Sequence, residues 1–216
     1  MNLVAASFVW PFRGEWRSRW LIGLGMVLLL PIAFIPLLGY AVAATRAAAA
    51  EPGTGLPPWA LSPRLLADGF WVALAIALVA APFALALGPL SSLIDSAPLW
   101  RVSDANLSRL YSELAAAFIL ALPWGLFMLL LMPHATHRFA LSGRPADLFD
   151  VPAALRSVKR DFANWNLAAA AIVTAWALGI ACIGLLCLGV VPGIFYAILV
   201  SAHATAALRS APDAAT

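Results

Sequence analysis

The chain has 216 residues, of which 63% are apolar and 11% are charged, and its formal net charge at pH 7 is +3. A soluble domain averages about 45–50% apolar and about 25% charged residues, so this composition excludes an ordinary soluble domain and predicts an all-α, polytopic membrane protein. The positive charge indicates arginines kept on the cytoplasmic side of the membrane rather than nucleic-acid binding. The length of the chain fits a single integral membrane domain over residues 1–216.

The membrane segments are predicted from runs without Asp, Glu, Lys or Arg, because about 20 apolar residues cross a hydrocarbon core about 30 Å thick. These runs cover residues 21–44, 69–88, 114–132 and 167–208. In the first run, Pro31 and Pro36 each remove a backbone donor and clash with the preceding turn. We therefore expect a hairpin of two helices, approximately 12–30 and 37–50. The sequence leaves open whether this hairpin spans fully or is re-entrant.

Four further helices are expected, at approximately 63–88, 105–140, 151–188 and 192–209. Ser62 and Pro63 form an N-cap followed by a first-turn proline, which marks the start of a helix. As one continuous helix, residues 167–208 would extend about 63 Å, twice the thickness of a bilayer. The chain must therefore turn within this run, and residues 189–193 (Gly-Val-Val-Pro-Gly) are the favoured place.

The distribution of basic residues supports the hairpin. If residues 21–44 turn back, both termini and the loops 45–68 and 133–166 share one side, and only Arg101 and Arg109 face the other. A single crossing would place the basic loop 133–166 outside, against the positive-inside rule. We therefore expect six membrane helices with cytoplasmic N- and C-termini. Arg far outnumbers Lys and Ala is abundant, which is typical of a GC-rich bacterial genome. The expected location is therefore a bacterial cytoplasmic (inner) membrane.

Side chains that favour a membrane boundary flank the apolar runs. Indole rings prefer this zone, and the candidates are Trp16, Trp20, Trp59, Trp71 and Trp165. Residues 148–165 carry apolar side chains at alternating steps of three and four, which is one face of a helix. Arg156, Lys159 and Arg160 lie on its polar side, so a basic amphipathic helix on the anionic leaflet is expected. Docking onto a partner protein is the alternative.

Sequence landmarks along nearly the whole chain follow the order of a known family. They are residues 8–16 (Phe-Val-Trp-Pro-Phe-Arg-Gly-Glu-Trp), Gly39-Tyr40 with Arg46, residues 56–59 (Leu-Pro-Pro-Trp) with Asp68-Gly69, residues 138–143 with 148–150, and residues 192–196 (Pro-Gly-Ile-Phe-Tyr) with Ala202-His203. By these landmarks the chain resembles the bacterial and archaeal membrane family called domain of unknown function 4013 (DUF4013). That family has no established activity, so the resemblance implies a multi-helix membrane domain and no catalytic function.

Three histidines are the candidates for a metal site. His134 and His137 are three residues apart and share a helix face, and His203 ends the last expected helix on the same side. Three imidazoles with a water molecule can hold Zn²⁺. However, the sequence contains no His-Glu-x-x-His motif and no nearby cysteine to complete a recognised set. We therefore expect interfacial histidines, with no metal and no cofactor.

Other polar residues do not form a catalytic pattern. Asp95 lies between two runs and is expected to be a loop residue or helix cap, with an outward vestibule as the alternative. Cys182 and Cys187 are about 8 Å apart along one helix, too far for a disulfide. The sequence shows no Gly-x-Ser-x-Gly motif and no paired carboxylates within the apolar runs. We therefore do not expect an enzyme.

The expected function is that of a non-catalytic accessory or assembly subunit that interacts with membrane lipid. Its partner would be lipid, another membrane protein or a second copy of the chain, because Gly179, Gly184 and Gly189 allow close helix contact. The alternative is a permease-like transporter of small or apolar solutes, in which Pro31, Pro36, Pro123 and residues 189–193 would break helices near the midplane.

Overall fold

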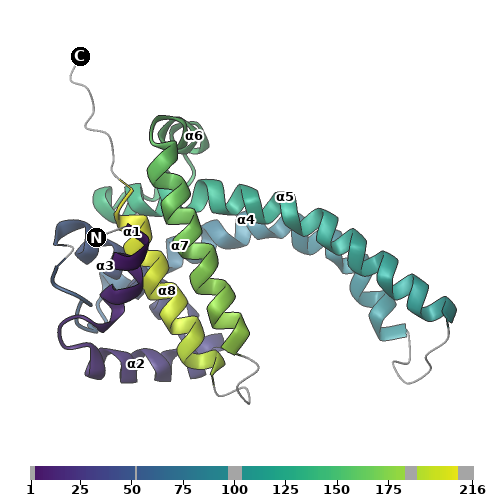
Figure 1. The fold of residues 1–216 in the computed structure, drawn as a ribbon, viewed down its shortest axis with the longest axis horizontal. Helices are drawn as coiled ribbons and strands as arrows, with labels where there is room; N and C mark the ends of the chain where they lie inside the picture. Colours follow the sequence, from purple (N-terminus) through teal and green to yellow (C-terminus); the bar gives the residue numbers. More distant parts are fainter. Residues whose placement is uncertain (1–2, 52, 97–103, 183–188, 209–216) are drawn as a thin grey trace. The chain divides into compact units, whose positions relative to one another are not determined.

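The computed structural model of the chain describes residues 3–51, 53–96, 104–182 and 189–208, and these residues form helices and loops without a β-strand (Figure 1). Their contacts divide the chain into two compact units. The first comprises Met1–Ala73 and Leu130–Thr216, and the second comprises Leu74–Leu129. The all-α prediction is confirmed for this part of the chain, and the single-domain expectation stays a prediction.

Eight α-helices and two short 3-10 helices (η) follow one another in the described residues. They are α1 (Leu3–Val9), η1 (Trp10–Phe12), α2 (Trp16–Leu28), α3 (Leu30–Ala50), α4 (Pro63–Ser96), α5 (Asp104–Ser142), η2 (Pro145–Leu148), α6 (Val151–Arg160), α7 (Phe162–Ala181) and α8 (Val190–Ala206).

Three helices in the described residues are long and apolar enough to cross a membrane: Leu30–Ala50, Pro63–Pro82 and Phe162–Ala181. They correspond to α3, the first part of α4, and α7. The last helix, α8, is apolar but has only 17 residues. A membrane protein with several apolar helices is therefore supported, whereas six spans remain a prediction.

The first apolar run breaks earlier than its prolines suggest. A turn through Pro31–Pro36 was expected, but α2 ends at Leu28 and α3 starts at Leu30 with Pro36 inside it. Pro31 lies in the first turn of α3, where a missing N–H leaves no intrahelical hydrogen bond unmade. The helix expected at 37–50 therefore begins at Leu30. The helix expected at 12–30 begins later, at Trp16, because residues 10–12 form η1.

The helix expected over 151–188 is divided at Asp161. This residue lies between α6 and α7, and the side-chain amide of Asn164 donates to its two carboxylate oxygens at 2.8 and 2.9 Å. The next helix, α8, begins at Val190, two residues before the expected 192, because proline is tolerated in the first turn of a helix. Residues 183–188, between α7 and α8, lie outside the described residues.

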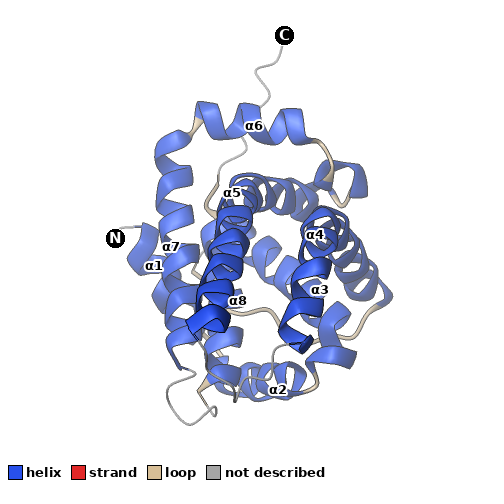
Figure 2. Cartoon of the chain, turned by 90° about the vertical axis from the view of Figure 1, so that its right-hand side faces the viewer, coloured by secondary structure: helices blue, strands red, loops and turns tan. Residues whose placement is uncertain are grey.

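Helices α7 and α8 make direct backbone contact within the first unit. A Cβ atom placed on Gly193 would lie 2.8 Å from the carbonyl oxygen of Gly179, and the reverse distance is also 2.8 Å. Any larger residue at either position would push the helices apart. The expected close contact at Gly179 is confirmed, and Gly184 lies outside the described residues. Figures 1 and 2 show α6 at one end of this helix pair and α2 toward the other.

An aromatic cluster fills the core between α2, α3 and α8. Trp10, Tyr40 and Phe195 are completely buried. Trp59 stacks on Tyr40 with ring centroids 3.7 Å apart and planes 4° apart, and its Nε1 donates to the Arg19 carbonyl at 2.9 Å. Of the indole rings expected at a membrane boundary, Trp59 is thus half-buried against Tyr40, and Trp165 is buried at 7% exposure.

Candidate functional site

A polar pocket lies in the first unit where α5 ends and α7 begins. It has a volume of about 640 Å³ and is lined by the end of α5, by η2, by α6 and by the residue that precedes α7. Its charged and imidazole side chains are Arg138, Arg144, Arg156, Arg160, Asp147, Asp150, Asp161, His134 and His137.

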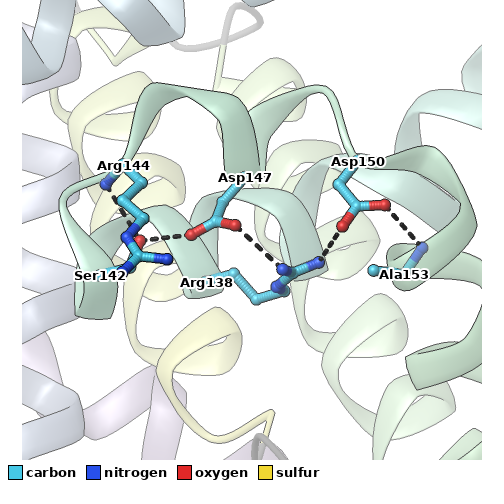
Figure 3. A network of polar contacts seen from close by, with 6 residues as sticks. All are labelled: Arg138, Ser142, Arg144, Asp147, Asp150 and Ala153. Carbon is cyan, nitrogen blue, oxygen red and sulfur yellow. Dashed lines mark hydrogen bonds and ion pairs between the residues drawn. The ribbon is translucent and has the colours of Figure 1, made fainter.

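Arg138 pairs with two carboxylates in the wall of this pocket (Figure 3). One guanidinium nitrogen, Nη2, lies 2.9 Å from Oδ1 of Asp147, and the other, Nη1, lies 3.1 Å from Oδ2 of Asp150. The planar, permanently charged guanidinium is suited to hold two acceptors at a fixed angle. Arg138 thereby ties η2 and the start of α6 to α5.

Asp150 and Ser142 complete this network. Asp150 is the N-cap of α6, and its Oδ1 accepts a hydrogen bond from the backbone N–H of Ala153 at 3.0 Å (Figure 3). That N–H and the Arg138 side chain hold the pKa of the Asp150 carboxyl below its usual value. The Ser142 hydroxyl donates to Asp147 and accepts from the backbone N–H of Arg144. Both carboxylates are therefore committed to local structure.

The remaining arginines of the pocket have no such partner. Arg144, Arg156 and Arg160 are exposed, and none of them forms an ion pair with another described residue. Arg156 and Arg160 are four residues apart on α6, a spacing at which like charges repel. The one other carboxylate, Asp161, is hydrogen-bonded by the Asn164 amide. The pocket therefore keeps uncompensated positive charge.

Two buried histidines form another part of the lining. His134 and His137 are each 4% exposed and lie beyond the apolar run that ends at residue 132. His137 hydrogen-bonds to the backbone of Thr205 on α8, whereas Nε2 of His134 has no hydrogen-bond partner among the described residues. Burial lowers the pKa of His134, and burial together with the nearby His134 lowers the pKa of His137 to about 4. The His137 ring is therefore neutral at pH 7.

The third histidine of the sequence analysis lies in a different environment. Nδ1 of His203 is 2.9 Å from Oγ of Ser7, and its ring packs on Trp10 with centroids 5.3 Å apart. The structure thus places His134 and His137 in the pocket but gives His203 other partners. Within the described part of the chain, no three His, Cys, Asp or Glu side chains are arranged to hold a metal ion. The side chain of Asp95 and all of Cys187 lie outside that part.

Comparison with known proteins adds a family assignment to this geometry. A family model described as "Protein of unknown function (DUF4013)" matches residues 23–200, most of the chain and all of the pocket lining. The chain belongs to the DUF4013 family. The expected resemblance is thereby confirmed. No curated protein and no solved structure matches the chain.

A second arginine cluster in this DUF4013 chain is not evident from the sequence. Arg46 on α3 pairs with Asp68 on α4, with Nη2 and Oδ2 3.0 Å apart, and its Nε donates to the Ala140 carbonyl on α5 at 2.8 Å. Asp68 is only 7% exposed. The sequence signal is the position of Arg46 and Asp68 beside apolar runs, but nothing in the sequence pairs them.

Close glycine contact brings these two partners together. A Cβ atom on Gly69 would lie 2.0 Å from the Ile35 carbonyl oxygen, and one on Gly39 would lie 2.0 Å from the Leu65 carbonyl oxygen. Helices α3 and α4 therefore cross with their backbones in contact, next to Arg46 and Asp68. In this DUF4013 chain the glycines set the helix spacing that the ion pair needs.

Proposed function

We propose that this DUF4013 protein is a non-catalytic integral membrane protein that interacts with lipid and serves as an accessory or assembly subunit. The observation that carries the proposal is the exposure of large apolar side chains on all three candidate spans. Ile32 is 85% exposed, Leu78 is 56% exposed and Ile180 is 60% exposed. Contact of apolar surface with water costs about 25 cal/mol per Å². Acyl chains or an apolar partner would remove that cost.

The proposed topology has six membrane helices in a bacterial cytoplasmic membrane, with cytoplasmic N- and C-termini. It is supported by the Arg46 cluster, which joins the end of α3, the start of α4 and the end of α5. These are the segments that the positive-inside rule assigns to one side. A reporter fused after Ala50 tests the arrangement. Cytoplasmic activity is expected, and an outward-facing reporter would contradict it.

A non-catalytic role is supported by the engagement of the described polar groups. The Ser7 hydroxyl donates to the Leu3 carbonyl while it contacts His203, and Ser7 is completely buried. A serine nucleophile would instead give its proton to the imidazole and face a substrate. In the pocket, Asp147 and Asp150 are both engaged in ion pairs with Arg138.

Extraction and co-purification test the function as a whole. The full chain is expected to leave membranes only with detergent, and native mass spectrometry of the purified protein should detect bound lipid, a second copy or another membrane protein. Recovery of a folded monomer without detergent would overturn the proposal. The permease-like alternative has its own test, which is solute flux in proteoliposomes that is lost on Pro192→Ala.

A further inference from the structure

We infer that the pocket between α5, η2, α6 and α7 binds a phosphate group, with Arg144, Arg156 and Arg160 as its principal ligands. The phosphate would come from the headgroup of an anionic phospholipid or from free phosphate. The lipid source rests on the proposed membrane function, whereas the phosphate site itself does not.

The balance of charge in the pocket favours an anion. Arg138 is already matched by Asp147 and Asp150, which are its ion-pair partners at 2.9 and 3.1 Å. The lining as a whole holds four arginines and three carboxylates, which leaves one positive charge in excess. Guanidinium groups bind phosphate oxygens through paired, charge-assisted hydrogen bonds. A bound phosphate would also relieve the repulsion between Arg156 and Arg160.

His134 gives an independent indication of a ligand. It lines the same pocket, it is 4% exposed, and its Nε2 has no hydrogen-bond partner among the described residues. A buried polar atom without a partner is unfavourable, so such an atom in a pocket wall indicates a missing hydrogen-bonding group. Because Nε2 is itself buried, the ring would have to turn toward the pocket before its Nε2 proton could be donated to a phosphate oxygen.

The size and position of the pocket favour a lipid headgroup as the source. Its volume of about 640 Å³ lies within the range of about 300–1,000 Å³ typical of small-molecule sites and exceeds the need of an isolated phosphate ion. Asp161 in its wall directly precedes the candidate span Phe162–Ala181. Beside the pocket, Val151, Leu155 and Phe162 are exposed apolar side chains. A headgroup at the end of a span would place its acyl chains against such residues.

The test measures the affinity of the full chain in detergent for phosphatidylglycerol by native mass spectrometry, with phosphatidylcholine as the zwitterionic comparison. We expect preferential binding of phosphatidylglycerol. Arg156→Gln combined with Arg160→Gln should weaken it about tenfold for each arginine, because a hydrogen bond to a charged group has about that effect. Lys159→Gln is the matched control. It removes one charge from the same helix but not from the pocket lining, so it should change affinity less than threefold.

Competition with inorganic phosphate distinguishes the two sources. If phosphate displaces the lipid only weakly, the headgroup is the ligand. If phosphate binds with the same dependence on Arg156 and Arg160 while lipid does not, the site takes free phosphate. Binding of neither, or an equal loss in Lys159→Gln, overturns the inference. Thermal unfolding checks that each variant folds. If the double variant does not fold, the same binding measurement is made on Arg144→Gln, because Arg144 lies outside α6.

These outcomes are separable from those of the proposed function. A chain that requires detergent but binds neither ligand refutes the phosphate site and leaves the membrane assignment intact. A detergent-free monomer that binds phosphate through Arg156 and Arg160 refutes the membrane assignment and leaves the site intact.

Discussion

Two arginine clusters lie within the first unit, and they use the same side chains in opposite ways. Around Arg46, the donors are used by one nearly buried carboxylate and one backbone carbonyl. Around Arg138, two carboxylates satisfy one arginine, while three other arginines remain without an ion-pair partner among the described residues. The first cluster is matched within the protein and holds helices together. The second keeps donors in excess, which suits a ligand.

The largest expected loss of stability comes from breaking the Arg46–Asp68 ion pair. Arg46→Met keeps the volume of the side chain but leaves the Asp68 carboxylate buried without its partner. Removal of one member of a fully buried ion pair costs about 3–5 kcal/mol. Here the Asp68 side chain is 10% exposed and the Arg46 side chain 29%, so a somewhat smaller but still large drop in the free energy of unfolding is expected. Arg46→Met combined with Asp68→Leu should recover part of it. Chemical denaturation in detergent measures both, and an unchanged Arg46→Met protein would contradict a structural role.

The next effect tests the helix spacing beneath that cluster. Gly69→Ala places a methyl group against the Ile35 carbonyl oxygen and must separate α3 from α4. Overpacking of this kind costs about 1–3 kcal/mol. Gly25→Ala on α2 is the control, because no atom lies within 4 Å of its added Cβ, and Ala is favoured over Gly in helices by about 1 kcal/mol. The unfolding midpoints of the two variants should therefore move in opposite directions.

A substitution at the second cluster should affect binding more than stability. Arg138→Gln releases Asp147 and Asp150, and their negative charges then face the remaining arginines. We expect a stability loss smaller than that of Arg46→Met, because the Asp150 side chain is 38% exposed against 10% for Asp68, and exposed ion pairs contribute little. The affinity for phosphatidylglycerol should nevertheless fall more than tenfold. Equal losses of stability in the two arginine variants would remove the distinction between the clusters.

The smallest expected effect near neutral pH is on stability, through the titration of the buried His137 ring. Burial lowers the pKa of His137 to about 4, from an ordinary value of 6.5. The unfolded chain therefore binds more protons between these values, so stability falls as the pH drops from about 6.5 toward 4. A His137→Gln protein should show a shallower dependence over this window. An identical pH profile for both proteins would contradict the assignment of a buried, neutral ring.

Local patterns in the sequence predicted the helices and several of their boundaries. Ser62 caps α4, as its Oγ accepts from the backbone N–H of Leu65 at 3.1 Å, and α6 begins at Val151 as expected. Only part of the apolar face expected over 148–165 is buried in the structure. Leu148 and Val158 are buried, whereas Val151 and Leu155 are about two-fifths exposed. Periodicity identifies one face of a helix but not what covers each part of it.

Long-range pairing could not be read from the sequence. Arg46 meets Asp68 only because Gly39 and Gly69 let two helix backbones touch, and no spacing rule links these four positions. Trp59 shows the same limit, since its indole resembles a boundary residue until Tyr40 is found stacked on it. The sequence pattern singled out Arg156, Arg160 and His134, but it did not predict the division of the helix at Asp161 that separates α6 from α7 beside the pocket.

The contact between Gly179 and Gly193 has a mechanical consequence. With no side chain between the two backbones at that point, the distance between α7 and α8 is set by backbone atoms and cannot be adjusted by a change of rotamer. A larger residue at Gly179 or Gly193 would therefore displace one helix from the other. It would also move Asp161, which precedes α7, relative to Thr205 on α8, the partner of His137.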